Sequence, residues 1–171
     1  MMKGKIICIN LERSLDRKQK MINKLNNEGF KNDANDDSLK YEFFQAFDGC
    51  TLDPNNSVLN LFKHSVEGLQ RRGVCGCALS HYHVWKKLLV ETDYDYFLVL
   101  EDDVDFKSEF RSKLDLILNQ IAFNHQIILL GMTIELKNFE ITRQLYKYDT
   151  SYTIHPLDRN LYAGGAFGYI V

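Results

Sequence analysis

Several features that would assign a chain to a class at once are missing from this sequence. No apolar stretch approaches the ~20 residues of a membrane span, and the apolar part of the basic start is far too short for a signal peptide. We therefore expect a cytoplasmic protein, with peripheral attachment to a membrane left open. The net charge of -2 argues against nucleic-acid binding, because phosphate contacts require a basic surface.

Cysteine is also scarce, and its placement argues against a disulfide framework. The chain has 4 cysteines, and Cys75 and Cys77 are too close together for an ordinary disulfide. Cys8 lies in an apolar segment that we predict to be a buried strand. These positions favour a reducing compartment.

Glycine-rich nucleotide motifs are absent as well. The sequence contains neither G-x-G-x-x-G nor a Walker loop, which argues against a dinucleotide cofactor or a P-loop ATPase. Ser80 and His81 are adjacent and no nucleophile elbow surrounds them, so a serine hydrolase is also disfavoured.

What is present is a regular alternation of apolar strands and amphipathic helices. The length of 171 residues fits a single domain over 1–171 with a sizeable core. All-apolar strands typify a mostly parallel sheet covered on both faces by helices, an α/β fold. We expect strands at 5–10, 41–47, 96–100 and 126–130, a half-exposed hairpin at 141–155 and a last strand at 166–171, with helices at 14–28, 58–62, 73–91 and 108–121.

Ligands of such sheets bind beyond the carboxyl ends of the strands. The residues expected to border one crevice there are Asn10–Arg13, Asp48-Gly49, Glu101–Asp105 and Gly131. The helix at 73–91 is expected to pack into the core through an apolar stripe made of Ala78, Tyr82, Trp85, Leu88 and Leu89.

The most informative segment is the apolar strand 96–100 and the acidic residues that follow it. Glu101, Asp102, Asp103 and Asp105 crowd negative charge at the tip of a buried strand. Such crowding costs stability, because like charges repel and each carboxylate resists losing water. A hard divalent cation, Mn²⁺ or Mg²⁺, would offset that cost and could bridge the carboxylates to a nucleotide diphosphate. The alternative is a solvated acidic loop at a helix start, which could account for Asp105.

Two further clusters carry candidate chemistry. Arg13 and Arg17 lie at the start of the first helix, where backbone amides and arginines suit a phosphate. An ordinary helix cap with exposed arginines would give the same sequence pattern. Cys77 and His81 are four residues apart and could share a helix face. Together with Cys75 and His83 they could imitate a zinc site, but the spacing matches no common zinc motif, and tight packing of small residues is the favoured role.

Taken in order, five segments resemble glycosyltransferase family 25, and the match spans nearly the whole chain. The helix start Gly73–His81 resembles that family's G-x-x-G-C-x-L-S-H motif, and the strand end Leu98–Asp103 resembles its acidic strand end. The other three segments are Ile9–Arg17, Phe44–Gly49 and Gly164–Val171.

The resemblance implies a GT-A, Rossmann-like fold, and because the sequence stops within an expected strand, a C-terminal truncation stays open as an expectation. It also implies a nucleotide-sugar donor, usually UDP-galactose, a Mn²⁺ or Mg²⁺ cofactor and transfer with inversion to a saccharide or hydroxylysine acceptor. By this resemblance Asp103 is the metal ligand and a catalytic residue, Asp102 orders the site, and Glu101 reaches the ribose. A shifted register, Asp103-Val104-Asp105, makes Asp105 a second metal ligand.

The same resemblance, with the two arginines, assigns the remaining substrate-binding residues. The donor or the acceptor would lie against Asn10, Leu11, Arg13, Arg17, Asp48, Ser80 and His81. Inverting transfer also needs a base, for which Asp158 is a candidate unless the base lies outside this chain.

Two other interpretations stay open, as does a homo-oligomeric state. The chain could be a degenerate, non-catalytic module that binds a sugar nucleotide. A phosphatase resembling the haloacid dehalogenases could use Asp103 and Asp105, but that class has its D-x-D after the first strand and follows it with Thr or Val, where Lys107 stands here.

Overall fold

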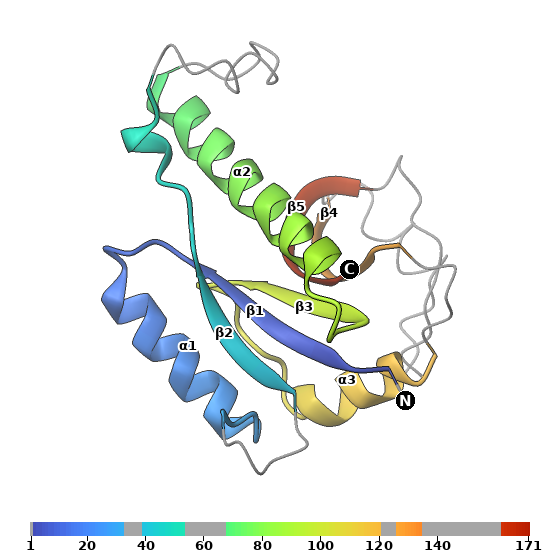
Figure 1. Cartoon of the computed structure of the whole chain (residues 1–171). Helices are drawn as coiled ribbons and strands as arrows, with labels where there is room; N and C mark the ends of the chain where they lie inside the picture. Colours follow the sequence, from blue (N-terminus) through green and yellow to red (C-terminus); the bar gives the residue numbers. More distant parts are fainter. Residues whose placement is uncertain (1, 33–38, 54–67, 121–125, 135–161) are drawn as a thin grey trace.

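Strands and helices alternate along the chain, as the sequence predicts. The computed structural model describes residues 2–32, 39–53, 68–120, 126–134 and 162–171 (Figure 1). In order, the elements are β1 (Gly4–Asn10), α1 (Leu15–Asn27), β2 (Lys40–Gln45), the short 3-10 helix η1 (Gly49–Thr51), α2 (Gly68–Val90), β3 (Tyr96–Glu101), α3 (Phe110–Leu118), β4 (Ile128–Ile134) and β5 (Tyr162–Ile170).

The strands form a mixed sheet of five strands in the order β2-β1-β3-β5-β4. β1 is parallel to β2 and to β3, whereas β5 is antiparallel to both of its neighbours, β3 and β4. It follows that β4 runs in the same direction as β3, so the mostly parallel prediction holds for β1 to β4. It fails for β5, which follows the other strands in sequence and is inserted between two of them.

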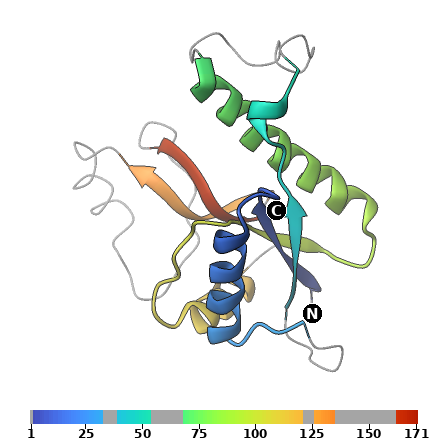
Figure 2. The same cartoon turned by 90° about the vertical axis from the view of Figure 1, so that its left-hand side faces the viewer.

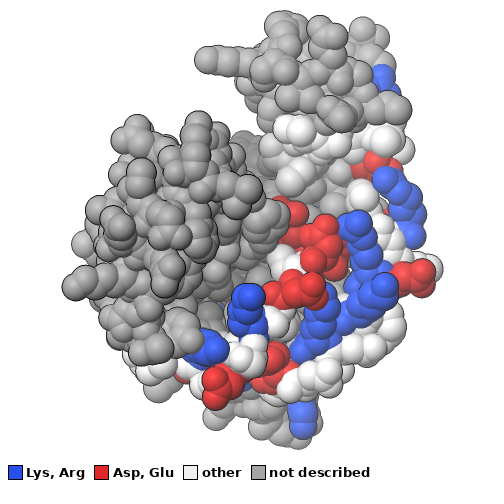
Figure 3. Space-filling model, turned by 180° about the vertical axis from the view of Figure 1, so that it is seen from behind, with Lys and Arg blue, Asp and Glu red and all other residues white. Residues whose placement is uncertain are grey.

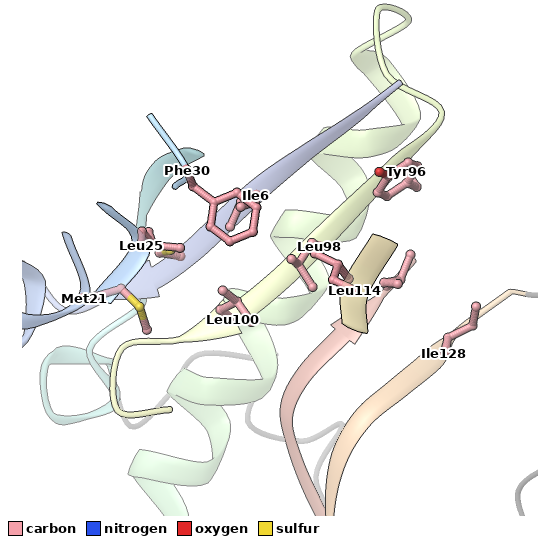
Figure 4. Packing of buried hydrophobic residues seen from close by; sticks show 11 residues of the cluster. Ile6, Met21, Leu25, Phe30, Tyr96, Leu98, Leu100, Leu114 and Ile128 are labelled. Carbon is pink, nitrogen blue, oxygen red and sulfur yellow. The ribbon is translucent and has the colours of Figure 1, made fainter. Parts of the chain in front are cut away.

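Helices cover both faces of the sheet (Figure 2), which confirms the predicted α/β class. On one face, α1 packs through Met21 and Leu25 and α3 packs through Leu114. Figure 4 shows these side chains against strand residues that include Ile6, Leu98 and others of the same cluster. Burial of each such side chain contributes about 1.5–3 kcal/mol, so this cluster is a main source of stability.

On the other face, α2 lies across the sheet. Alternate residues of β1, Ile7 and Ile9, point to this side and pack with Phe97, Val99 and Val84. Because both faces of β1 and β3 are buried, these strands are apolar at nearly every position, the pattern expected for strands covered on two sides.

Helix α2 presents a different side to the sheet from the one predicted. Tyr82, Trp85 and Leu89 were expected in the core, but they are exposed. The buried positions are instead Cys75, Gly76, Ser80, His81 and Val84. The hydrophobic stripe was misleading because the two polar side chains on the buried side find hydrogen-bond partners there, which removes most of the cost of burying them.

Several helices and strands begin or end at residues other than those predicted. Gly131 lies inside β4, paired with Gly168, rather than ending the strand. Helix α2 begins at Gly68, before the predicted start, and α3 begins at Phe110 after Glu109 in the left-handed conformation (φ 61°). The expected helix at 58–62, the hairpin at 141–155 and Asp158 lie outside the described residues.

None of the described helices combines the length and the apolar character that crossing a bilayer requires. The 4 cysteines are all free: Cys8 and Cys75 are buried, whereas Cys50 and Cys77 are exposed.

Candidate active site

The predicted site residues meet at the edge of the sheet where β1, β2 and β3 end. Because these strands are parallel, Asn10 is level with Gln45 of β2, and Ile9 is level with Glu101 of β3. The loop after β1, the loop after β2 and the acidic turn after β3 therefore share one edge, as expected for a parallel α/β sheet.

Asp102 is the most enclosed carboxylate of the acidic turn, with its side chain 11% exposed. Asn10, itself buried, donates from Nδ2 to Asp102 Oδ2 at 2.7 Å and to the carbonyl of Ser14 at 3.2 Å. Arg17 of α1 donates from Nη1 to Asp102 Oδ1 at 3.1 Å. Both carboxylate oxygens thus have partners from β1 and α1, which fix the turn after β3 in place.

Asp103 and Asp105 are more open. Arg17 Nη1 also lies 3.3 Å from Asp103 Oδ2, but the Asp103 side chain is 54% exposed. Lys24 lies 2.7 Å from Asp105 Oδ1, and this ion pair holds the pKa of the exposed Asp105 below its ordinary value. On the described part of the face in Figure 3, acidic and basic side chains lie next to one another rather than in patches of one sign.

A cavity of about 710 Å³ opens at the same sheet edge, between the loops that follow β1 and β2, and none of its lining residues belongs to the acidic turn. Arg13 and Asp48 form an ion pair at its wall, joining the two loops. The cavity brings three of the predicted binding residues together, and its full lining is Leu11, Glu12, Arg13, Phe44, Gln45, Ala46, Phe47, Asp48, Thr51 and His83. Its volume lies within the range of pockets for small ligands.

Close packing of α2 against the loop after β2 shapes one side of this cavity. A Cβ on Gly76 would lie 2.5 Å from the Phe47 carbonyl oxygen and 2.6 Å from the Gly49 nitrogen, so only glycine fits. Ser80 holds the same contact, accepting from the Phe47 backbone N–H at 2.9 Å and donating to the Gly76 carbonyl at 2.7 Å. Ser80 therefore positions the loop, and direct substrate binding by Ser80 stays a prediction.

His81 lies behind the acidic turn in a buried network. Its Nδ1 is 2.7 Å from the hydroxyl of Tyr169, and its Nε2 is 3.3 Å from Glu101 Oε1. Trp85 donates from Nε1 to the same Tyr169 hydroxyl at 2.9 Å. Burial lowers the pKa of His81, but hydrogen bonds to Cys77 and Glu101 outweigh it and raise the pKa to about 9.

Sequence reasoning assigned no site role to Phe47, Tyr169 or Trp85, and considered His83 only as a zinc ligand. His83 instead stacks against Phe47, with ring centroids 4.6 Å apart, at the wall of the cavity. His83 lies three residues after Ser80, so both side chains lie on the side of α2 that faces the loop after β2, but no local pattern links Tyr169 to helix α2. The expectation that Asp102 orders the site stays a prediction; its contacts with Asn10 and Arg17 join the turn after β3 to β1 and α1.

Comparison with known proteins identifies the family of this chain. The model of glycosyltransferase family 25 (LPS biosynthesis protein) matches residues 3–156. The match covers most of the chain, including both loops around the cavity and the acidic turn. The chain belongs to glycosyltransferase family 25.

Individual relatives agree with this assignment. "Putative glycosyltransferase R655" of Acanthamoeba polyphaga mimivirus is 48% identical over 167 residues, which cover 98% of this chain and 49% of that protein. Procollagen galactosyltransferase 2 of Homo sapiens is 30% identical over 125 residues, 68% of this chain and 18% of that protein. The inactive glycosyltransferase 25 family member 3 of Homo sapiens is 29% identical over 124 residues. The chain thus spans half or less of the length of these relatives.

Proposed function

We propose that this chain carries the donor site of a metal-dependent glycosyltransferase. The reaction would move a sugar, galactose from UDP-galactose in the first instance, to a saccharide or hydroxylysine acceptor with inversion. The observation that carries the proposal is the meeting of Asn10, Arg17, Asp102 and Asp103 at the sheet edge from which the cavity-lining loops after β1 and β2 also extend. Galactose is favoured because one relative is named a procollagen galactosyltransferase.

The residues around the cavity suit a nucleotide diphosphate. Arg13 and Arg17 lie at the start of α1, where the backbone amides and the helix dipole favour negative charge. Both arginine side chains are more than half exposed, so each could reach a phosphate while keeping its aspartate partner. Leu11 and Phe44 add apolar wall to the same cavity and would contact the less polar parts of the donor.

The donor atoms at the acidic turn fit a hard cation. Asp103 offers an exposed carboxylate, which among the described residues is contacted only by Arg17 through one oxygen. Oxygen ligands of this kind suit Mn²⁺ or Mg²⁺, which take their remaining ligands from phosphates and water. Asp105 fits less well, because Lys24 already holds one of its oxygens at 2.7 Å.

The roles of the chain's own residues follow from these contacts. Asn10 and Arg17 hold Asp102, which fixes the backbone that presents Asp103 to the donor. Arg17 would also neutralise negative charge on the departing diphosphate, an electrostatic contribution that a preorganised site makes effective. A bound divalent cation would add Lewis-acid stabilisation of the same leaving group.

The test is hydrolysis of UDP-galactose by the purified chain with Mn²⁺, followed as UDP release. Asp103→Asn should lower turnover by at least 100-fold, whereas Glu109→Gln, a change at an exposed acid beside α3, should leave it unchanged. Turnover that survives Asp103→Asn would remove this residue from the mechanism.

A second candidate function is a non-catalytic module that binds a sugar nucleotide. It is favoured by the likeness to a relative named as inactive. Binding of UDP-galactose that requires Mn²⁺ and Asp103, without any UDP release, would support this function over the first.

A further inference from the structure

Three side chains with different metal-ligating atoms meet behind the acidic turn. Cys77 and His81 lie one turn apart on α2, and Glu101 is the last residue of β3. One ligand atom from each lies within 4.8 Å of the other two. The predicted partners Cys75 and His83 are not in this group, because Cys75 is buried elsewhere and His83 stacks on Phe47.

The histidine ring is held in the orientation that a metal ligand needs. The Tyr169 hydroxyl lies 2.7 Å from Nδ1 and is itself fixed by the indole N–H of Trp85 at 2.9 Å. Nε2 is therefore directed at Glu101. Ligating histidines commonly have their second ring nitrogen bonded in this way, which fixes both the tautomer and the ring.

The separation between His81 and Glu101 suits a small ion. Zinc binds nitrogen, oxygen and sulfur at about 2.0–2.3 Å, so two ligands of a tetrahedral ion lie roughly 3.3–3.7 Å apart. The 3.3 Å between His81 Nε2 and Glu101 Oε1 falls at the edge of this range and is long for an N–H···O hydrogen bond. Cys77 is exposed, which leaves a path for an ion to enter and room for a fourth ligand.

Glu101 and Cys77 share His81 as a hydrogen-bonding partner. Among the described residues, no lysine or arginine pairs with Glu101 or Cys77, although Lys and Arg side chains pair with Asp102, Asp103 and Asp105 nearby. The carboxylate and the thiol thus converge on one imidazole. A divalent ion there would displace the proton on His81 Nε2 and bind Cys77 as the thiolate.

We propose that Cys77, His81 and Glu101 form a binding site for a thiophilic divalent cation, Zn²⁺ by preference. A sulfur, nitrogen and oxygen set of three protein ligands with an open position suits zinc, whereas the oxygen ligands at Asp103 suit a hard cation. An ion bound there would anchor helix α2 to the end of β3.

Cobalt(II) is the probe for this site, because a cobalt–thiolate bond absorbs in the near ultraviolet and tetrahedral Co²⁺ absorbs visibly. The reduced full chain, stripped of metal with a chelator, is titrated with Co²⁺ and then with Zn²⁺. We expect both absorptions to saturate at one Co²⁺ per chain and to disappear when one equivalent of Zn²⁺ is added.

Matched variants separate the site from other ligands. Cys77→Ser should abolish the near-ultraviolet band, whereas Cys50→Ser, a change at the other exposed cysteine, should leave it intact. Tyr169→Phe, which removes the partner of Nδ1, should weaken Zn²⁺ binding by roughly 10- to 100-fold. Cys77 is exposed, so its serine variant should fold, which circular dichroism checks.

A missing band in the native chain, or a band that persists in Cys77→Ser, would overturn the proposal. Asp103→Asn should retain the band in full. Asp103→Asn should lose UDP-galactose turnover and keep the cobalt band, whereas Cys77→Ser should lose the band and keep the turnover. The two assays therefore distinguish the failure of one proposal from the failure of the other.

Discussion

At the scale of single residues, the acidic turn is less costly than the sequence implies. Four carboxylates lie at the end of one buried strand, yet Arg17 pairs with Asp102 and Asp103, and Lys24 pairs with Asp105. Much of the repulsion is therefore offset by the protein's own cations. The crowding of acids alone does not require a metal, and the case for one rests on the exposed carboxylate of Asp103.

Asn10 should contribute more to the free energy of unfolding than the small size of its side chain suggests. Asn10→Ala would remove the 2.7 Å hydrogen bond to a largely buried carboxylate, leaving Arg17 as the described partner of Asp102. We expect the free energy of unfolding to fall by about 1–3 kcal/mol, the usual cost of losing a buried hydrogen bond to a charged group. Urea denaturation measures this, with Asn23→Ala on the exposed side of α1 as the control. Equal effects of the two substitutions would contradict the role given to Asn10.

At the scale of elements, helix α2 shows what local patterns could and could not predict. Its existence follows from helical spacing, and the motif from Gly73 to His81 marks its contact with the loop after β2. Its buried side could not be predicted from hydrophobicity, because Ser80 and His81 are buried while Trp85 and Leu89 are exposed. Tertiary hydrogen bonds to Phe47, Tyr169 and the backbone determine which side of α2 is buried, and these partners come from distant parts of the chain.

The strands also have some features that local patterns predict and others that they do not. β1 and β3 were predictable because burial on both faces makes them apolar throughout. The reversed direction of β5 and the continuation of β4 past Gly131 were not, because strand direction depends on the connecting chain. At the candidate site, the loops at the sheet edge could be predicted from strand direction, whereas the pairing of Arg17 with Asp102 depends on how α1 packs.

Two glycines of α2 should respond to alanine in opposite directions. At Gly73 a Cβ would meet nothing within 4 Å, so Gly73→Ala should raise the free energy of unfolding by about 0.5–1 kcal/mol through helix propensity. Gly76→Ala would press against the Phe47 and Gly49 backbone and should lower it by about 1–3 kcal/mol.

Urea denaturation of the two variants in parallel tests this difference. A stabilising Gly76→Ala would show that the loop after β2 can move away from α2. The cavity should then change shape, which a change in the affinity for UDP-galactose would report.

At the scale of the whole molecule, an ion-pair network joins three elements at the amino end of the sheet. Lys5 of β1 lies 2.5 Å from Glu42 of β2 and 3.3 Å from Glu91, which follows α2. Lys87 of α2 lies 2.9 Å from Glu42 and 2.6 Å from Glu91. Burial alone would raise the pKa of Glu42, but Lys5 and Lys87 outweigh it and lower that pKa below its ordinary value of 4.5.

This network predicts a pH dependence of stability. Because the folded pKa of Glu42 is below the unfolded value, its contribution is complete above about pH 4.5 and is lost as the pH falls through the folded pKa. Glu42→Gln should therefore lower the free energy of unfolding by about 0.5–1 kcal/mol at pH 7, since the pair is partly exposed. The difference from the native chain should vanish in acid.

Urea denaturation at several pH values checks this, with Asp115→Asn as the control. Asp115 pairs only with Arg111 on the same helix among the described residues, so its substitution should change stability little. A Glu42→Gln effect that stays constant from pH 7 into acid would show that the network contributes through packing rather than charge.

The insertion of β5 between β3 and β4 has a consequence for how the protein is made. During translation, β3 leaves the ribosome with one edge unpaired, and β4 has no neighbour in the sheet until β5 follows. Both exposed edges could pair with other chains in that interval. Assembly of the sheet must therefore wait for residues far along the chain, and shielding of nascent chains by a chaperone would bear directly on the yield of folded protein.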